Sequence, residues 1–303
     1  MKTITRRMQA GLSLVELMIA MLLSLLLIGG VLQIFLSSKQ TYSSNVALSQ
    51  VQESGRYALD FLTYDLRNAG YKGECVSPLN NLTGLTDDRY TLDMGLQGWD
   101  NSQSDPPWFT NGRKSGTDII LLKHAVNSSG AIPSTASTST SITTTAATGI
   151  ASGILLILSD PLGCDMFSNA SAPADSSVSL PTGSSFGHIY PSTSEILKFQ
   201  STVYYIKDND RKNPTLWRVR YIKNSKAAET AEELVEGIQN LQIKYAFGDI
   251  NGSITGSYVD AQSITDWSKV ISAQITLTVT SIDANNPMTR TFTSTVGIRN
   301  RLP

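Results

Sequence analysis

The sequence predicts an α+β fold, in which one long N-terminal helix packs on a C-terminal antiparallel β-sheet head. Residues 12–36 form an apolar run, and residues 37–69 continue it without proline as a helical stripe. The C-terminal half consists instead of segments rich in β-branched and aromatic residues, which are typical of strands. A helix followed by grouped strands is the element order of an α+β protein.

Composition limits the classes of function. The chain has 303 residues, so one or two domains are expected. Its net charge is −1 and its pI is about 6.1, so the charge balance does not predict nucleic acid binding. Only 16% of the residues are charged, and serine and threonine are abundant. This profile indicates an exported surface protein rather than a cytosolic enzyme.

The apolar run 12–36 is long enough to be a membrane anchor. A helix of this length measures about 37 Å, and the hydrocarbon core of a bilayer is about 30 Å thick. Three of the residues 2–7 are basic, which by the positive-inside rule keeps the N-terminus in the cytoplasm and places the rest of the chain on the far side. A cleaved secretory signal peptide has a shorter apolar region, and a buried core helix alternates polar and apolar faces.

Glu16 is the only ionisable side chain in this run. A carboxylate at this depth costs about 2.5–3.5 kcal/mol on insertion scales, so its presence predicts a function. The alternative is a plain anchor in which Glu16 has no role.

The residues around Glu16 carry a resemblance. A basic leader, Gly11, the segment LSLVE from Leu12 to Glu16 and an apolar helix resemble the class III signal of type IV prepilins and pseudopilins. The resemblance implies that a membrane prepilin peptidase cleaves between Gly11 and Leu12 and methylates the new amine of Leu12. It also implies that Glu16 remains as the fifth mature residue. The family more often has phenylalanine where this chain has Leu12.

Electrostatics explains why such a signal would keep its acid. A subunit that docks into a filament brings its free amine into lipid, where a lone cation is as unfavourable as a lone carboxylate. Pairing the Leu12 amine with Glu16, of the same or a neighbouring subunit, compensates both charges. We therefore expect Glu16 to set the stagger between subunits during assembly.

The helix is expected to continue to Ala69. Apolar or small residues recur there in steps of three and four, at Leu48, Val51, Gly55, Ala58, Leu62, Leu66 and Ala69. Gly70 is placed to end the helix in a left-handed conformation. One continuous helix over 12–69 would be about 87 Å long. Gly29 and Gly30 interrupt it, either as a bend or local melting of the helix or as a site where another helix packs closely.

Further segments resemble the PilW-type minor pilins in particular. The matching segments are residues 55–62, 65–71, 158–167, 204–206, 216–218, 233–238 and 261–267. The resemblance spans nearly the whole chain and is loose in the middle. It implies a non-enzymatic subunit that joins other minor pilins to prime assembly at the pilus tip.

The middle of the chain reads as loops between short strands. Residues 77–117 are expected to be loop, Asp118 to Val126 a strand, and Ile154 to Leu158 a short buried strand. The low-complexity tract 134–149 is a flexible loop, an extended β edge or a glycosylated tract. Residues 168–193 are expected to form another connection.

The C-terminal half is expected to be an antiparallel sheet. The predicted strands are Ile196 to Lys207, Thr215 to Ile222, Leu241 to Phe247, Val270 to Ile282 and Arg290 to Arg299. A turn at 285–287 is expected to join the last two as a hairpin, and residues 229–238 are expected to form one short helix.

Cys75 and Cys164 are the only cysteines. In an oxidising periplasm they are expected to form a disulfide, which would stabilise the fold by about 4–5 kcal/mol in the chain-entropy model. The alternative is two unpaired buried thiols. With two cysteines and two histidines no metal site is expected, and no cofactor is predicted.

Two short motifs resemble a catalytic site and a calcium-binding loop, but the residues around them do not fit either function. Residues 183–187 fit G-x-S-x-G, with Ser185 and His188 as candidate catalytic groups, but prolines flank the motif and no histidine follows His188. Residues 249–253 (DINGS) offer oxygen ligands for calcium but lack the spacing and terminal glutamate of a calcium loop. A β-turn is the expected structure there.

The sequence as a whole predicts a minor pilin. The expected parts are a leader over 1–11, a pilin helix over 12–69 whose residues 12–36 cross the inner membrane, and a periplasmic β-rich head over 70–303. Expected partners are the prepilin peptidase, other minor pilins, the major pilin, the inner-membrane assembly platform and, before assembly, the bilayer. The expected process is motility, adhesion or DNA uptake. The alternatives are a minor pseudopilin of a type II secretion system and, remotely, a membrane-tethered hydrolase using Ser185 and His188.

Overall fold

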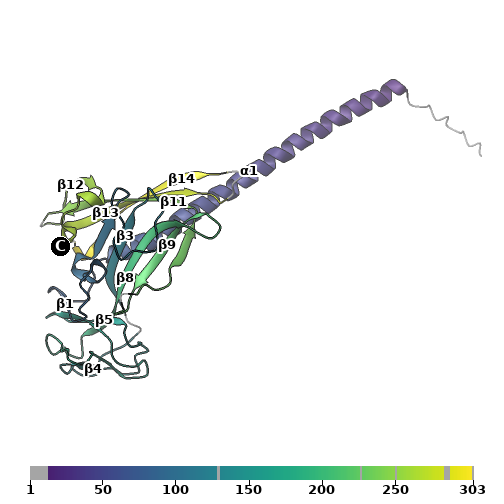
Figure 1. Ribbon diagram of the computed structural model, residues 1–303. Coiled ribbons are helices and arrows are strands. Elements are labelled where there is room, and N and C mark those ends of the chain that lie inside the picture. The colour runs from purple at the N-terminus through teal and green to yellow at the C-terminus, as the bar shows by residue number, and fades with distance from the viewer. Residues whose placement is uncertain (1–12, 128–129, 226, 250, 283–286, 302–303) are drawn as a thin grey trace, which may run out of the picture.

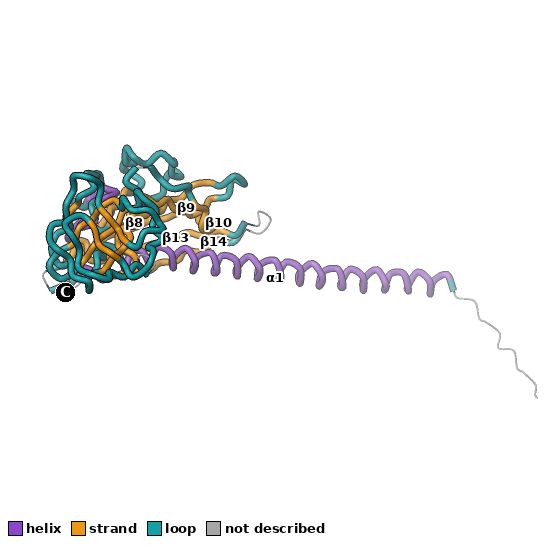
Figure 2. The backbone as a smooth tube through the Cα atoms, turned by 90° about the horizontal axis from the view of Figure 1, so that it is seen from below, coloured by secondary structure: helices purple, strands orange, loops and turns teal. Residues whose placement is uncertain are grey.

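The protein is a β-rich head from which one long helix projects as a rod (Figure 1). The computed structural model describes residues 13–127, 130–225, 227–249, 251–282 and 287–301. Helix α1 spans Leu14–Asn68, and Ala69 is its C-cap. Gly70 follows with φ +80°, the left-handed conformation predicted for this glycine. Figure 2 shows that only the C-terminal part of α1 lies against the head.

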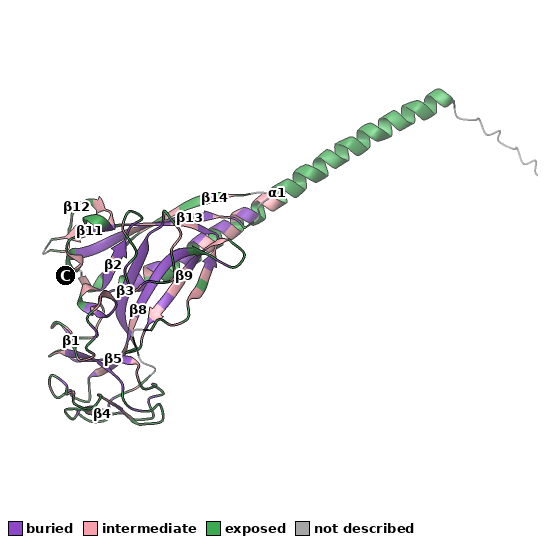
Figure 3. Cartoon of the chain, viewed as in Figure 1, coloured by how far each residue is buried: buried purple, intermediate pink, exposed green. Residues whose placement is uncertain are grey.

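Burial divides α1 into two halves. Every described residue from 14 to 42 is exposed, and burial begins at Ala47 (Figure 3). The buried face repeats in steps of three and four and consists of Ala47, Val51, Gly55, Ala58, Leu62, Asp65 and Leu66. The predicted stripe is confirmed from Val51 onward, whereas Leu48 is only half-buried and Ala47 is buried in its place. Tertiary packing therefore stabilises the second half of the helix, while the apolar first half has no partner within the described chain.

The strands form a large sheet, a four-stranded sheet and a two-stranded ribbon. The large sheet has the order β1-β6-β5-β8-β3-β2, with β9 paired to β8 and β10 paired to β9. Its strands are β1 (Asn80–Asn81), β2 (Leu96–Trp99), β3 (Ile119–Asn127), β5 (Leu155–Ser159), β6 (Cys164–Ser168), β8 (Glu195–Asp208), β9 (Pro214–Tyr221) and β10 (Glu232–Glu236). All these pairings are antiparallel except that of β1 with β6.

The four-stranded sheet has the order β12-β11-β13-β14 and is antiparallel throughout. Its strands are β11 (Ile238–Gly248), β12 (Ile254–Val259), β13 (Val270–Thr280) and β14 (Thr289–Gly297). The ribbon pairs β4 (Ser141–Thr143) with β7 (Ser177–Ser179). Short 3₁₀ turns complete the described chain: η1 (Asp88–Tyr90), η2 (Leu92–Met94), η3 (Ala261–Ser263), η4 (Trp267–Lys269) and η5 (Arg299–Arg301).

Strand β3 shows how the head builds two cores from one sheet. Its side chains alternate between faces, so Ile120 and Leu122 pack with α1 and the four-stranded sheet, whereas Ile119 and Leu121 pack into a second core on the other face. Both faces are covered, which explains why this strand is an almost continuous apolar run. A third, smaller core lies under the β4–β7 ribbon.

Most strand predictions are confirmed and one helix prediction is wrong. The five predicted C-terminal strands correspond to β8, β9, β11, β13 and β14, and the two predicted strands of the middle to β3 and β5. The predicted short helix at 229–238 is instead strand β10, which pairs with β9 across a bulge and is followed by Gly237 with φ +90°. The β13–β14 hairpin is present; part of its turn lies outside the described residues.

The predicted loops contain more order than expected. Residues 77–117 include β1, β2 and two 3₁₀ turns, and 168–193 includes β7. The tract 134–149 contributes β4, so the extended-edge alternative holds for Ser141–Thr143. The described helix runs continuously through Gly29 and Gly30, and a Cβ at either would meet no atom within 4 Å. No local melting occurs there, and no described part of this chain packs on the glycines.

The close approach of the two main sheets requires a residue without a side chain at position 98. Gly98 on β2 is buried, and a Cβ there would collide with the Oη atom of Tyr245 on β11 and lie 2.8 Å from its Cζ atom. We expect Gly98→Ala to lower the free energy of unfolding by about 1–3 kcal/mol, because the buried ring has little room to move. Urea unfolding followed by tryptophan fluorescence checks this. Gly30→Ala is the control for replacing a glycine that is not left-handed, because a Cβ there meets no atom within 4 Å. Equal losses in the two variants would contradict the packing argument.

Candidate functional site

The exposed half of α1 is the most unusual surface of the protein. Its large apolar side chains from Leu14 to Leu36 are 49–74% exposed, and none of them contacts a core. This is the one described helix that is long and apolar enough to cross a membrane. A soluble surface seldom leaves so large a contiguous apolar patch uncovered. The chemistry of this surface suits lipid or the apolar helices of other subunits.

Glu16 lies at the start of this surface, at the third position of the helix. Its Oε2 atom accepts a hydrogen bond from the backbone N–H of Ser13 at 3.1 Å, so the carboxylate folds back toward the N-terminal end. This contact is half of a capping box, in which Ser13 is the N-cap. The predicted cleavage residues Gly11 and Leu12 lie outside the described residues. Glu16 nevertheless points at the backbone of the residue that directly follows Leu12.

A buried polar network fastens the second half of α1 to the head. Asp65 faces the core, and its Oδ2 atom accepts a hydrogen bond from the Tyr204 hydroxyl on β8 at 2.7 Å. The Nε2 atom of His124 on β3 lies 3.3 Å from Asp65 Oδ1. All three side chains are almost fully buried. Burial and the nearby Asp65 charge raise the pKa of Tyr204 well above its ordinary value, so the tyrosine remains a donor.

Sequence reasoning missed this network. The signal for Asp65 was available, because a charged residue three positions after Leu62 falls on the apolar stripe of the helix. A carboxylate on a buried face requires partners. The identity of those partners follows only from the fold, which brings strands β3 and β8 together beneath the helix.

Cys75 and Cys164 are joined by a disulfide with their Cα atoms 5.7 Å apart. The bond links the segment that leaves α1 to the first residue of β6. Both cysteines are buried, and the backbone N–H of Cys75 also donates to Ser159 Oγ at 3.2 Å. The start of the head is thus connected covalently to the large sheet close to the end of the helix.

A buried lysine lies near the same junction. Lys123 on β3 is fully buried, and its Nζ atom donates to the carbonyl oxygen of Asp88 at 2.6 Å. Burial lowers the pKa of Lys123 to about 7, and the neighbouring Arg301 contributes in the same direction. The charged form is therefore disfavoured in the folded protein.

This lysine predicts a pH dependence of stability. Between about pH 7 and its ordinary pKa of 10.5 the unfolded chain binds the proton and the folded chain does not, so stability rises with pH. The expected slope from this group is at most about 1.4 kcal/mol per pH unit. Urea unfolding at pH 7, 8 and 9 should show that Lys123→Met flattens the rise, whereas Lys207→Met at an exposed position leaves it unchanged. The same slope in all three proteins would rule out Lys123 as its source.

The candidate hydrolase residues do not form a catalytic triad. His188 Nε2 lies 3.0 Å from Asp160 Oδ2, but Ser185 is exposed, and no described hydrogen bond joins it to His188. Asp160 Oδ1 accepts from the backbone N–H groups of Leu162 and Gly163, both at 2.9 Å. The pair therefore fastens the turn between β5 and β6 to a neighbouring loop. A nucleophile elbow requires a helix directly after the serine, and the described chain has no helix between β7 and β8.

The candidate calcium residues form a turn. Asp249 Oδ1 accepts hydrogen bonds from the backbone N–H groups of Asn251 at 2.9 Å and Ser253 at 2.8 Å. Within the part of the chain that the structure describes, no group of three or more acidic, histidine or cysteine side chains is arranged to hold a metal ion. The Asp249 carboxylate therefore stabilises the turn by accepting backbone hydrogen bonds.

Two family models match the chain. Residues 203–300 match the type IV pilus-assembly protein W family, and residues 6–32 match the prokaryotic N-terminal methylation motif. The first match covers the strands from β8 to β14 and reaches η5, and the second covers the segment around Glu16. No curated protein and no solved structure gives a significant match. Domains of the pilin class are structural rather than catalytic.

Proposed function

We propose that this chain, which matches the type IV pilus-assembly protein W family and the N-terminal methylation motif, is a minor pilin that primes and assembles type IV pili as part of a tip complex with other minor pilins. In this proposal the prepilin peptidase removes residues 1–11 and methylates Leu12. Residues 12–69 form the assembly helix, and residues 70–303 form a periplasmic head. The subunit waits in the inner membrane, N-terminus in the cytoplasm, until the assembly platform moves it into the filament.

The observation that carries the proposal is the division of α1 into two halves. One continuous helix presents a bare apolar surface over 14–36 and a core-forming face over 47–66. The first half can exchange lipid for neighbouring helices, since both environments are apolar, and the second half holds the head in a fixed direction relative to that rod. Such a helix suits a subunit that moves from a bilayer into a bundle.

Glu16 supplies the register in this mechanism. Its carboxylate already folds back to Ser13 N, one residue from the amine that cleavage would create at Leu12. A carboxylate and an ammonium that leave water together cost less than either alone. Docking is then favoured at the stagger that places an unpaired amine beside an unpaired Glu16.

Deleting the gene tests the function. We expect loss of surface pili and of twitching motility with normal exoprotein secretion in the same strain. Lost secretion with intact pili would instead identify a type II pseudopilin. The N-terminus of the mature protein, read by mass spectrometry, should be methylated Leu12; a mature N-terminus at any other residue would contradict the prepilin assignment.

Complementation with point variants tests the role of Glu16. We expect Glu16→Ala to reduce surface pili at least about tenfold, because an uncompensated charge in lipid costs more than the roughly 1.4 kcal/mol that corresponds to a factor of ten. Glu53→Ala, an exposed acid on the head-proximal part of the same helix, is the matched control and should restore piliation. Both variants should be processed at Leu12. Normal piliation with Glu16→Ala would refute the register mechanism.

A further inference from the structure

Strand β14 leaves one edge of the four-stranded sheet unpaired among the described residues. It pairs with β13 over nine consecutive residues, from Thr289 to Gly297, without any register shift. It contains no proline and a single charged residue, Arg290. Natural proteins usually interrupt such edges with bulges, prolines or inward-pointing charges. The opposite edge strand, β12, has an irregular register and a left-handed glycine, Gly256.

The side chains of β14 divide between the two faces of the sheet. Phe292 packs against the main core, and Val296 is buried in it. Thr291, Thr293 and Thr295 are exposed on the other face. The inner residues therefore hold the strand against α1. Its outer backbone groups have no strand partner among the described residues, and a row of exposed threonines lies beside them.

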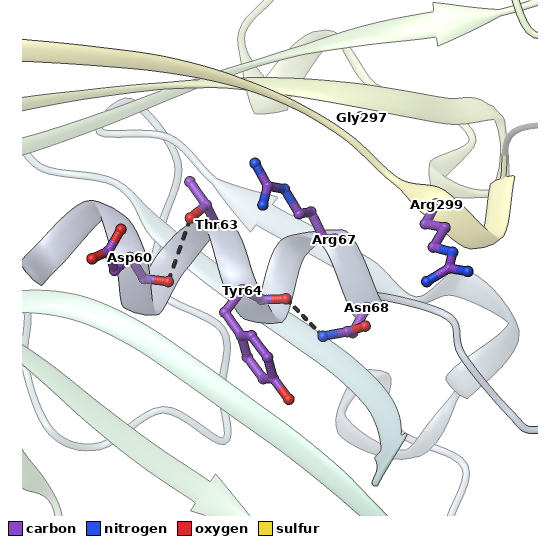
Figure 4. Close-up of a pocket in the computed structure, with 7 residues that line it drawn as sticks. All are labelled: Asp60, Thr63, Tyr64, Arg67, Asn68, Gly297 and Arg299. Carbon is purple, nitrogen blue, oxygen red and sulfur yellow. Dashed lines mark hydrogen bonds between the residues drawn. The ribbon is translucent and has the colours of Figure 1, made fainter. Parts of the chain in front are cut away.

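A pocket of about 570 Å³ lies where this edge meets the helix (Figure 4). It is lined by Asp60, Thr63, Tyr64, Arg67, Asn68, Gly297 and Arg299. In the figure, Arg67 extends from the helix toward the strand that carries Gly297, and Arg299 lies beyond the end of the helix. The pocket thus continues the line of the β14 edge.

The two arginines form no ion pair within the described chain. Both are exposed, and the helix end does not need them, because the Asn300 side chain donates to the carbonyl oxygens of Asn68 at 3.2 Å and Ala69 at 3.4 Å. With Asp60 as the only acid in the lining, the pocket carries an excess positive charge. Guanidinium groups are suited to bind carboxylates through paired N–H donors.

We propose that the β14 edge binds an extended, carboxylate-bearing strand from the head of a different pilin subunit, with the carboxylate in the pocket of Arg67 and Arg299. A row of backbone donors and acceptors selects a protein strand, and the arginines select an acidic residue near its end. Figure 1 shows β14 lying beside α1, the helix that packs against the helices of neighbouring subunits in the proposed function. The inference rests on the proposed function and adds the kind of partner segment that the head recognises.

Photocrosslinking in living cells tests the proposal. The full-length protein carries p-benzoyl-phenylalanine at Thr293, and adducts are identified by mass spectrometry. We expect an adduct with a distinct protein that has its own class III signal, at an extended segment containing Asp or Glu. The same probe at Lys207, exposed at the end of β8, is the control and should not capture that segment. No adduct at Thr293, or an adduct with a second copy of this chain, would overturn the proposal.

Charge reversal makes the test specific. Arg67→Glu combined with Arg299→Glu should lower the adduct yield about tenfold, because like charges then face each other, and Lys207→Glu should not change it. Replacing the captured acid by lysine should restore the yield in the double variant. An unchanged yield, or a loss without rescue at normal protein level, would overturn the role of the arginines. This test is independent of the deletion phenotype. If deletion abolishes pili but the probe at Thr293 captures nothing, the proposed function stands and the β14 edge is excluded as the binding site.

Discussion

Replacing Asp65 by alanine is expected to lower the free energy of unfolding by about 2–5 kcal/mol, because it leaves two buried polar groups without their partner at about 1–3 kcal/mol each. The Tyr204 hydroxyl would lose its acceptor and His124 would lose the carboxylate 3.3 Å away, both in a site that water does not reach. Urea unfolding of the full-length protein in detergent micelles, followed by tryptophan fluorescence, measures the loss. All four tryptophans lie in the head.

Matched variants separate this network from general effects on the helix. Asp60→Ala removes an exposed carboxylate one and a half turns earlier on α1 and should change stability by less than about 0.5 kcal/mol. Asp65→Asn keeps an acceptor for Tyr204 and should cost less than alanine. A double-mutant cycle with Tyr204→Phe should give a coupling energy of about 0.5–3 kcal/mol. Equal losses for Asp60→Ala and Asp65→Ala would disprove the argument.

The elements with a strong period were predictable from the sequence. The helix stripe from Val51 to Leu66 repeats over several turns, and only a helix places such residues on one face. Strand β13 alternates in the same reliable way, from Ile271 to Val279. The partition of the head into two sheets could not be read from these patterns, because alternation identifies a buried face and not the element that covers it.

The wrong helix at 229–238 shows the limit for short segments. Leu234, Val235 and Ile238 fit both a helical and an extended pattern, so period alone could not decide between them. The fold decided through pairing: Glu232 opposes Arg218 on β9 and forms an ion pair with it, and Gly237 allows the turn into β11. Contacts distant in the sequence outweighed local propensity.

The candidate site residues also differ in whether the sequence alone could identify them. Glu16 was found because an acid in an apolar run is conspicuous in the sequence itself. The pocket of Arg67 and Arg299 was not found, because its two arginines lie far apart in the sequence and line one pocket only when β14 lies along α1. An arginine in a last helical turn is unremarkable until the fold shows that another group already caps that helix.

Removing the disulfide is the second large change that we expect to measure. The double variant Cys75→Ser with Cys164→Ser should be less stable by about 4–5 kcal/mol, because a cross-link between residues 89 apart removes much of the conformational freedom of the unfolded chain. The midpoint of urea unfolding should fall while the native fluorescence spectrum stays the same, since the sheet around β6 retains its ladder. Reduction of the wild-type protein should reproduce the shift.

The position of the disulfide gives this loss a functional consequence. It ties the segment after α1 to β6, whereas Asp65 ties the helix itself to β3 and β8. The two connections thus fasten the same junction in different ways, one by a covalent bond and one by buried polar contacts. We expect cells carrying the serine variant to accumulate less of the protein and fewer pili, and to regain both at lower growth temperature. A variant that is as stable as the oxidised wild type would show that the packed sheet alone holds the junction and that the cross-link adds nothing to it.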